Sequence, residues 1–248
     1  MDRAIYTMMN AAISESERHS ITANNLSNAS TSGFRAQIPT AKSIPIQGPT
    51  LSTRTLSIAT TPMHSSAPGP IYYSGNNLDV AIMNDGWLTV QLKNGTEGYT
   101  KNGNITINEE GKLKVKNYPL LSSEGSEIEI PPGASLTISN DGVISVLGAG
   151  DSPKSIVSIG KLKLVKAKPN EFYLNNNGIF MTYKNKKLTE DTSVKLISGA
   201  FEESNVQTID AIIKIINNAR NFEINMKIIN DINENSRLSN QILSFNQA

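Results

Sequence analysis

The sequence predicts an α+β protein, with N- and C-terminal helices forming an α-helical coiled-coil domain and a central antiparallel all-β domain between them. First, the stretch Glu203–Phe245 contains no Pro or Gly and places apolar residues at alternating intervals of three and four. Second, residues 1–28 repeat this spacing. Third, short apolar runs alternate with Gly-containing turn dipeptides between Asn77 and Gly199. The first two patterns indicate helices, and the third is typical of antiparallel strands.

The C-terminal stretch is expected to form one long helix with a coiled-coil seam, a row of apolar side chains that requires a partner. At about 1.5 Å per residue it would reach roughly 60 Å, more than a compact domain of this chain length needs. The expected interface residues are Ile212, Ile215, Ala219, Phe222, Met226 and Ile229. Ser204 or Asn205 is expected to cap this helix, with Asp210 near its positive end. Beyond Ile229 the positions in register are polar, and we expect intrachain pairing to give way there to other chains.

Residues 1–28 are predicted to form a second helix, which pairs with the first. Its seam residues are small or of modest size: Ile5, Met9, Ala12, Ser16, His19, Ala23 and Leu26. Another helix could therefore approach closely, and the larger side chains of the C-terminal helix would pack onto it. For His19, a packed or partly solvated seam position is favoured over a role as ligand or base.

Four segments follow from these patterns. Residues 1–37 hold the first helix and its terminating turn, and residues 38–76, rich in Pro, Ser and Thr, are expected to be an extended linker arm. Residues 77–199 form the β domain, and residues 200–248 complete the helical domain. The turn dipeptides of the β segment are Asp85-Gly86, Asn94-Gly95, Asn102-Gly103, Glu110-Gly111, Asp141-Gly142 and Asn177-Gly178. Short strands at this spacing predict an antiparallel sandwich or barrel.

Composition argues against several classes of protein. A net charge of +1 with scattered basic residues gives no basis for nucleic-acid binding. The absence of Cys excludes disulfides and thiolate metal sites, and two distant His residues supply neither a triad nor a zinc site. We therefore expect no catalytic, cofactor or metal site. The N-terminus lacks the features of a cleaved signal peptide, and no segment has the roughly 20 apolar residues of a membrane span, so membrane insertion is not expected.

The turn after the first helix carries the run Asn-Leu-Ser-Asn-Ala-Ser-Thr-Ser-Gly-Phe-Arg. This run resembles the N-terminal signature of the bacterial flagellar basal-body rod and hook family. The residues that carry the match are Asn25, Leu26, Asn28, Gly33, Phe34 and Arg35.

Further segments are similar to the same family and occur in its order: Leu78–Trp87, Gly98–Asn104, Glu203–Val206 and Ala219–Lys227. The stretch Pro49–Leu56 resembles the proximal-rod members, and the longer insertion typical of distal-rod members is missing. The resemblance thus extends from end to end of the chain.

The resemblance implies a structural protein rather than an enzyme. It implies a proximal-rod subunit that assembles with copies of itself and with other rod proteins into the periplasmic shaft, which transmits torque from motor to hook. It also implies export by the flagellar type III apparatus without a cleaved signal peptide. Two alternatives remain open: a distal-rod or hook-family subunit, and, more remotely, a peptidoglycan-binding or peptidoglycan-hydrolysing β domain. Because an isolated apolar stripe gains little until it is covered, we expect the termini to be disordered in the monomer and to order on assembly.

Overall fold

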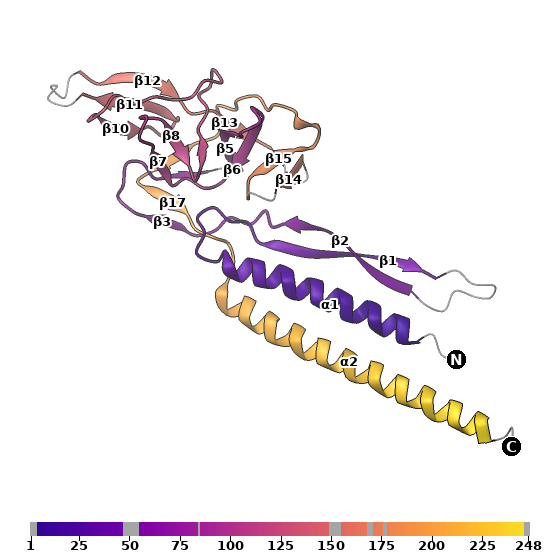
Figure 1. The fold of residues 1–248 in the computed structure, drawn as a ribbon. Helices are drawn as coiled ribbons and strands as arrows, with labels where there is room; N and C mark the ends of the chain where they lie inside the picture. Colours follow the sequence, from indigo (N-terminus) through magenta and orange to yellow (C-terminus); the bar gives the residue numbers. More distant parts are fainter. Residues whose placement is uncertain are drawn as a thin grey trace. The chain divides into compact units, whose positions relative to one another are not determined.

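The computed structural model describes residues 4–46, 55–83, 85–148, 155–167, 171–175 and 178–245. It has an N-terminal helix, a C-terminal helix and a central region of antiparallel strands, as the α+β prediction requires (Figure 1). The chain divides into two compact units. The helical unit comprises residues 1–29, 36–65 and 206–248, and the β unit comprises residues 30–35 and 66–205.

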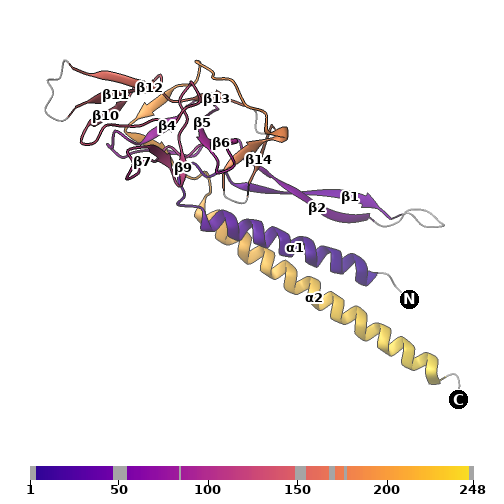
Figure 2. The same ribbon diagram turned by 45° about the horizontal axis from the view of Figure 1, so that its top comes forward.

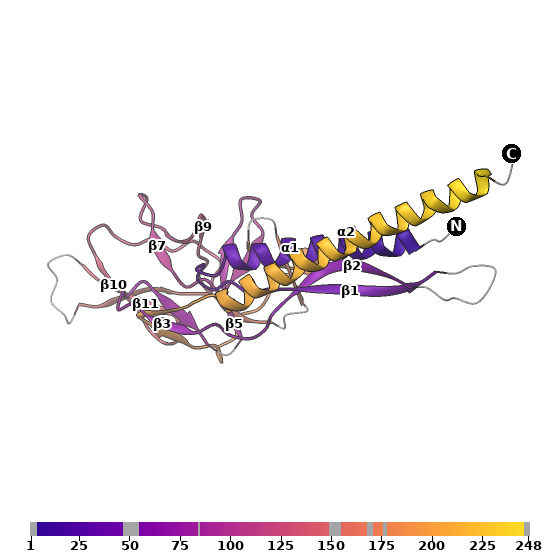
Figure 3. The same ribbon diagram turned by 90° about the horizontal axis from the view of Figure 1, so that it is seen from below.

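In the helical unit, α1 (Ala4–Ser27) and α2 (Thr208–Phe245) lie side by side and run in opposite directions (Figures 1, 2 and 3). The helix α2 has 38 residues against 24 in α1. At about 1.5 Å per residue, roughly 20 Å of α2 therefore exceeds the length that α1 can cover.

The segment predicted to be a linker arm instead forms a long hairpin of the helical unit. Strand β1 (Gln37–Pro45) pairs with β2 (Thr55–His64), with Gln37 opposite His64 and Pro45 opposite Thr55. An irregularity in register between Ile38 and Thr40 accommodates Pro39. Pro is tolerated at bulges and strand ends of a two-stranded ribbon, because the missing N–H is not needed there. The stretch Pro49–Leu56 lies largely outside the described residues.

Among the described residues of the β unit, every strand pairing is antiparallel. The largest sheet has five strands in the order β13 (Leu164–Lys166), β5 (Gly86–Gln91), β6 (Glu97–Thr100), β15 (Phe180–Thr182) and β14 (Phe172–Leu174). Two three-stranded sheets contain β10 (Ser135–Ile138), β11 (Val143–Leu147) and β12 (Val157–Lys161), and β7 (Ile105–Ile107), β8 (Leu113–Val115) and β9 (Tyr118–Pro119). Two further pairs join β4 (Val80–Ile82) to β16 (Leu196–Ser198) and β3 (Ile71–Tyr73) to β17 (Ala200–Glu202).

The core of the β unit has an aliphatic part and an aromatic part. Successive residues of β5 point to opposite faces of the sheet, so Leu88 joins the aliphatic cluster and Trp87 joins the aromatic one. Trp87 packs against Phe172 and Phe180 at ring-centroid distances of 4.9 and 4.8 Å. Several of the predicted turns contain Gly with positive φ: Gly95, Gly111, Gly142 and Gly178. Asn177, from the last predicted dipeptide, lies outside the described residues.

Candidate functional site

Within the described ranges, no group of three or more His, Asp or Glu side chains could hold a metal ion, and no helix is long and apolar enough to cross a membrane. His19 is exposed on α1, whereas His64 is half-buried at the end of β2. Burial lowers the pKa of His64 below its ordinary value. The candidate site consists of the family-motif residues with their partners and the surfaces of the two helices.

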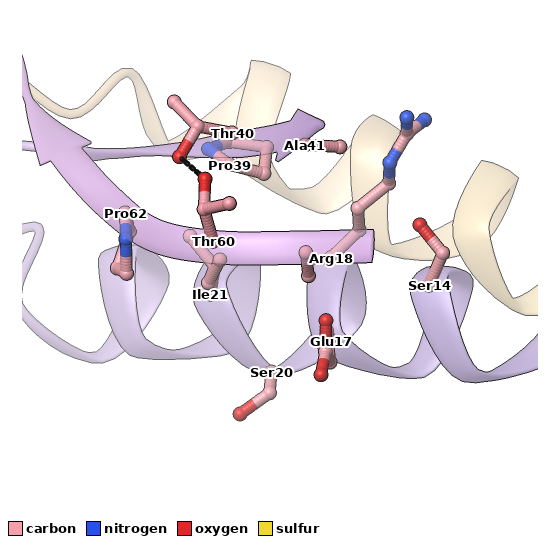
Figure 4. A pocket seen from close by; sticks show the side chains of 11 residues that line it. Ser14, Glu17, Arg18, Ser20, Ile21, Pro39, Thr40, Ala41, Thr60 and Pro62 are labelled. Atoms are coloured by element: carbon pink, nitrogen blue, oxygen red, sulfur yellow. Dashed lines mark hydrogen bonds between the residues drawn. The ribbon is translucent and has the colours of Figure 1, made fainter. Parts of the chain in front are cut away.

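A cavity of about 430 Å³ lies in the helical unit between α1 and the β1–β2 hairpin (Figure 4). Hydroxyl groups line much of it, and the Thr40 and Thr60 hydroxyls hydrogen-bond to each other at 2.9 Å. Glu17 and Arg18 contribute charges of opposite sign. The cavity contains no His and only one acidic side chain, so its lining provides neither paired acid–base groups nor a nucleophile with a base.

The first half of the family motif binds within the helical unit. The Asn25 side chain donates a hydrogen bond to the Gln37 carbonyl and accepts one from the Gln37 N–H, both at 2.8 Å. The Asn28 side chain donates to the Asn24 carbonyl at 2.9 Å, beside the 3.2 Å bond that the same carbonyl accepts from the Asn28 N–H at the end of α1. Leu26 is half-buried on α1.

The second half of the motif lies in the β unit. Gly33 has φ +67°, and its N–H donates to the Glu202 carbonyl at 2.7 Å. A Cβ at Gly33 would lie 2.4 Å from the backbone nitrogen of Asn102 and 2.5 Å from the carbonyl oxygen of Lys101. Only glycine fits here, because a side chain would meet both the conformational restriction and the neighbouring backbone. Phe34 is half-buried, and its carbonyl accepts a hydrogen bond of 3.3 Å from the Asn205 N–H.

Arg35 forms a buried ion pair with Glu202. The guanidinium Nη2 lies 2.8 Å from Glu202 Oε1, and both side chains are 5% exposed. Arg35 also donates to the Ala67 carbonyl, and the Gly69 N–H donates to Glu202 Oε1 at 2.7 Å. Burial lowers the pKa of Arg35 from its ordinary value, while the charges of Glu202 and then Asp85 oppose that change.

A second cation lies close to this pair. Lys101 is buried, and its Nζ lies 5.5 Å from the centre of the Trp87 ring. Burial lowers the pKa of Lys101 to about 8, with Glu202 raising it, Arg35 lowering it and Asp85 raising it to smaller extents. The motif therefore ends in a buried group of charges inside the β unit.

The prediction that Ser204 or Asn205 caps the C-terminal helix is wrong. Helix α2 begins at Thr208, so Ser204 and Asn205 precede it and do not occupy its cap position. The Asn205 side chain instead donates to the Ala67 carbonyl at 2.8 Å, and Ser204 is buried in the β unit. Short polar residues before a helix can form caps or stabilise turns. Here Asn205 bonds to another segment of the chain and does not cap the helix.

The predicted seam of α1 is unevenly buried. Ala12 is buried, and Ile5 and Leu26 are half-buried. Met9 is 50% exposed, and Ala23 is exposed.

The predicted seam of α2 divides in the same way. Ile215 and Ile229 are half-buried, but Ile212 is 44% exposed and Met226 40%, and Ala219 is exposed. Phe222 is 40% exposed. The buried and half-buried residues of α2 are Ala211, Ile215, Asn218, Asn225, Ile228, Ile229, Ile232 and Ser236.

Asn218 and Asn225 explain why some of the predicted seam residues of α2 are exposed. The Asn218 side chain lies 3.5 Å from the Thr22 hydroxyl of α1, within hydrogen-bonding distance. A row containing Ile215, Phe222 and Ile229 can be completed at alternate positions by Ala219 and Met226 or by Asn218 and Asn225. Hydrophobicity alone favours Ala219 and Met226, but the structure half-buries Asn218 and Asn225 instead.

Sequence reasoning did not identify Glu202 or Lys101 as partners of the motif. Glu202 directly precedes Glu203 in the sequence, and an adjacent acidic pair is typical of a solvated surface. Their different environments carry the distinction: Glu202 ends β17 and is buried, and Glu203 is exposed. Because successive side chains of a strand point to opposite faces, the sequence could have indicated that one of the two carboxylates faces the interior.

Three sequence models of protein families match the chain. They are described as flagella basal body rod protein, over residues 5–35, flagellar hook protein FlgE/F/G D1 domain, over residues 81–146, and flagellar basal body rod FlgEFG protein C-terminal, over residues 197–242.

Individual proteins are similar over almost the whole chain. The flagellar basal-body rod protein FlgF of Salmonella typhimurium strain LT2 is 43% identical over 99% of this chain and 100% of the relative. FlgF of Escherichia coli K12 is 41% identical with the same coverage. The rod protein FlgG of Buchnera aphidicola subsp. Schizaphis graminum is 28% identical over 85% of this chain and 88% of the relative.

Proposed function

The chain belongs to the flagellar basal-body rod family and is of the FlgF type, and we propose from this membership that it is a structural subunit of the proximal rod. The observation that carries the proposal is the 43% identity to a FlgF protein over 99% of this chain and the whole of that relative. The proposal has the chain assemble with copies of itself and with other rod proteins in the periplasm, into the shaft that transmits torque to the hook. Its export would use the flagellar type III apparatus without a cleaved leader.

Apolar side chains left exposed by both helices support a role in assembly. On α1, Tyr6, Met9 and Ile13 are 64%, 50% and 52% exposed and follow one another at intervals of three and four. On α2, exposed apolar residues include Ile209, Ile212, Ile213, Ile216 and Met226. Rows of apolar residues at this spacing are suited to a further helix.

We propose separate roles for the predicted interface residues, supported by their different burial. Within the subunit, Ala12, Ile215 and Ile229 take part in the coiled-coil pairing of α1 with α2. Met9, Ala23, Ile212, Ala219 and Met226 face neighbouring subunits. The part of α2 that exceeds the length of α1 serves the same contacts.

Replacement in living cells tests the function. The gene for this chain would replace that of the FlgF protein in Escherichia coli, and in a parallel strain that of FlgG. We expect restored swimming and recovery of the chain in isolated basal bodies only in the first strain. Cross-linking within those basal bodies should join the chain to other rod proteins. A chain that folds and is exported but is absent from basal bodies would refute the proposal, and restoration of only the second strain would indicate a distal-rod subunit.

A further inference from the structure

We propose that the buried Arg35–Glu202 pair is a clasp that positions the three segments of the β unit from which the chain continues into its helices and hairpin. These segments are residues 30–35, between α1 and β1, residues 66–70, after β2, and residues 202–205, before α2. Arg35 and Glu202 are thus positioning residues, and their role is geometric.

Glu202 binds the other two segments at once. Its carboxylate Oε1 accepts hydrogen bonds from Arg35 Nη2 at 2.8 Å and from the Gly69 N–H at 2.7 Å. Its backbone carbonyl accepts from the Gly33 N–H at 2.7 Å. Strand pairing of Glu202 with Ile71 and a 2.9 Å bond from the Glu203 N–H to the Pro70 carbonyl continue this attachment.

Arg35 and Asn205 close the arrangement into a ring. Arg35 donates to the Ala67 carbonyl as well as to Glu202, so it joins the first segment to both others. Asn205 donates from its side chain to Ala67 at 2.8 Å and from its backbone to Phe34 at 3.3 Å. Each segment is therefore held to both of its neighbours.

Stability alone does not account for a charge pair at this place. The cost of removing two charges from water often equals or exceeds their attraction, and apolar pairs of similar volume can replace buried ion pairs without loss of stability. An apolar pair, however, could not accept a hydrogen bond from Gly69 or donate one to Ala67. What the ion pair adds is the fixed attachment of the two backbone segments.

Gly33 and Gly69 show how closely the segments approach. A Cβ at Gly69 would lie 2.1 Å from the Glu203 carbonyl oxygen, and the Gly33 N–H bonds directly to the Glu202 carbonyl at 2.7 Å. The segments therefore contact one another through backbone, which fixes their spacing more firmly than contact through flexible side chains. In a shaft subunit, these segments are the covalent connections between the β unit and the helical unit, and the importance of their spacing there rests on the proposed function.

Amide exchange of the full chain, followed residue by residue with NMR, tests the clasp. In Arg35→Met, we expect the Gly69 amide to exchange at least tenfold faster, because the Gly69 N–H bonds to Glu202 and Glu202 is then no longer held in place by Arg35. Arg35→Lys should give an intermediate rate, since one ammonium can pair with Glu202 without the fork geometry that also reaches Ala67. The control Ile138→Ala removes core volume in β10 and should accelerate core amides without a selective effect on Gly69.

The double variant Arg35→Met with Glu202→Leu covers the case in which a single variant fails to fold. Its apolar pair should leave the melting temperature near that of the parent, while Gly69 again exchanges at least tenfold faster. Unchanged exchange at Gly69 in the double variant, or a change in Arg35→Met no larger than in Ile138→Ala, would overturn the clasp. Such a result concerns the isolated chain and would leave the rod assignment standing.

Discussion

The side chain of Asn25, near the end of α1, hydrogen-bonds to both the N–H and the carbonyl of Gln37, the first residue of β1. It therefore satisfies the same two backbone groups that a neighbouring strand would. This contact gives a physical reason for the first residue of the family motif: an amide carries both a donor and an acceptor in the required places.

Replacing Asn25 by Ala should destabilise the attachment of β1 to α1. Two hydrogen bonds are lost, each worth about 0.5–1.5 kcal/mol in net terms. Faster amide exchange at Gln37 is the expected result. Asn25→Asp should also fail to restore protection, since a carboxylate accepts from the N–H but repels the carbonyl. The matched control is Asn24→Ala, at an exposed position one residue earlier; equal effects of the two Ala variants would contradict the prediction.

Gly33→Ala should prevent normal folding of the β unit. The added Cβ meets both a positive φ of +67° and backbone atoms at 2.4–2.5 Å. Gly125→Ala separates these two causes, because Gly125 has φ +82° but no atom within 4 Å of its ideal Cβ. That control should cost only about 1–2 kcal/mol from the left-handed conformation. Denaturant unfolding measures both variants, and similar losses would show that the backbone contact is unimportant.

Phe222→Asp should block incorporation into the rod while the β unit stays folded. The change places a charge in the apolar row of α2, where Phe222 is still 40% exposed in the isolated chain. Recovery of the variant in isolated basal bodies measures incorporation, and near-UV circular dichroism of the Trp87 cluster reports on the β unit. Asn230→Asp, which puts the same carboxylate at an exposed position outside this row, should assemble normally. Normal assembly of Phe222→Asp would remove this residue from the interface.

Helix content should rise when subunits assemble. Many apolar side chains of α2 are exposed in the single chain, including Ile209 at 74% and Ile242 at 68%, so the helix gains little from burial there. Far-UV circular dichroism and amide exchange of the purified monomer are expected to show weakly protected terminal segments beside a protected β unit. A long, strongly protected helix in the monomer would contradict this expectation.

Stability should increase with pH between about 8 and 10 because of Lys101. Burial lowers its pKa in the folded chain to about 8 from an ordinary value of 10.5. The unfolded chain therefore binds more protons in this range, and the free energy of unfolding rises with pH. Charges that face Lys101 come from Glu202, Arg35 and Asp85.

The variant Lys101→Met isolates this contribution. Melting temperatures at pH 7 and pH 9.5 should differ less in the variant than in the parent chain. Measurement should stop near pH 10, because burial raises the pKa of Tyr99 to about 12 and its opposite effect begins there. Lys116 also has a pKa lowered by burial, but it is present in both proteins and cancels in the comparison. An unchanged difference between the two pH values would contradict the assignment to Lys101.

Local patterns in the sequence predicted much of the fold. The helix period predicted α1 and α2, and Gly-containing dipeptides predicted turns of the β unit, including those at Gly95, Gly111 and Gly142. The hairpin of β1 and β2 was not predicted, because its Pro and Ser/Thr content lacks the alternation of a half-buried strand. Pairing of two exposed strands depends on what lies beside them, which sequence periodicity does not record.

The sequence by itself determined the helical and strand-forming tendencies of each segment and the motif that places the chain in its family. These properties depend on neighbours within a few residues, through turn chemistry and side-chain period. Only the tertiary structure decided that Asn218 rather than Ala219 is half-buried on α2, and that Glu202 is the partner of Arg35. The hydrogen bond from Gly69 to Glu202, for example, joins residues that are 133 positions apart in the sequence. Such partners are selected by burial, since a buried charge or amide must find a complementary group wherever the folded chain brings one within reach.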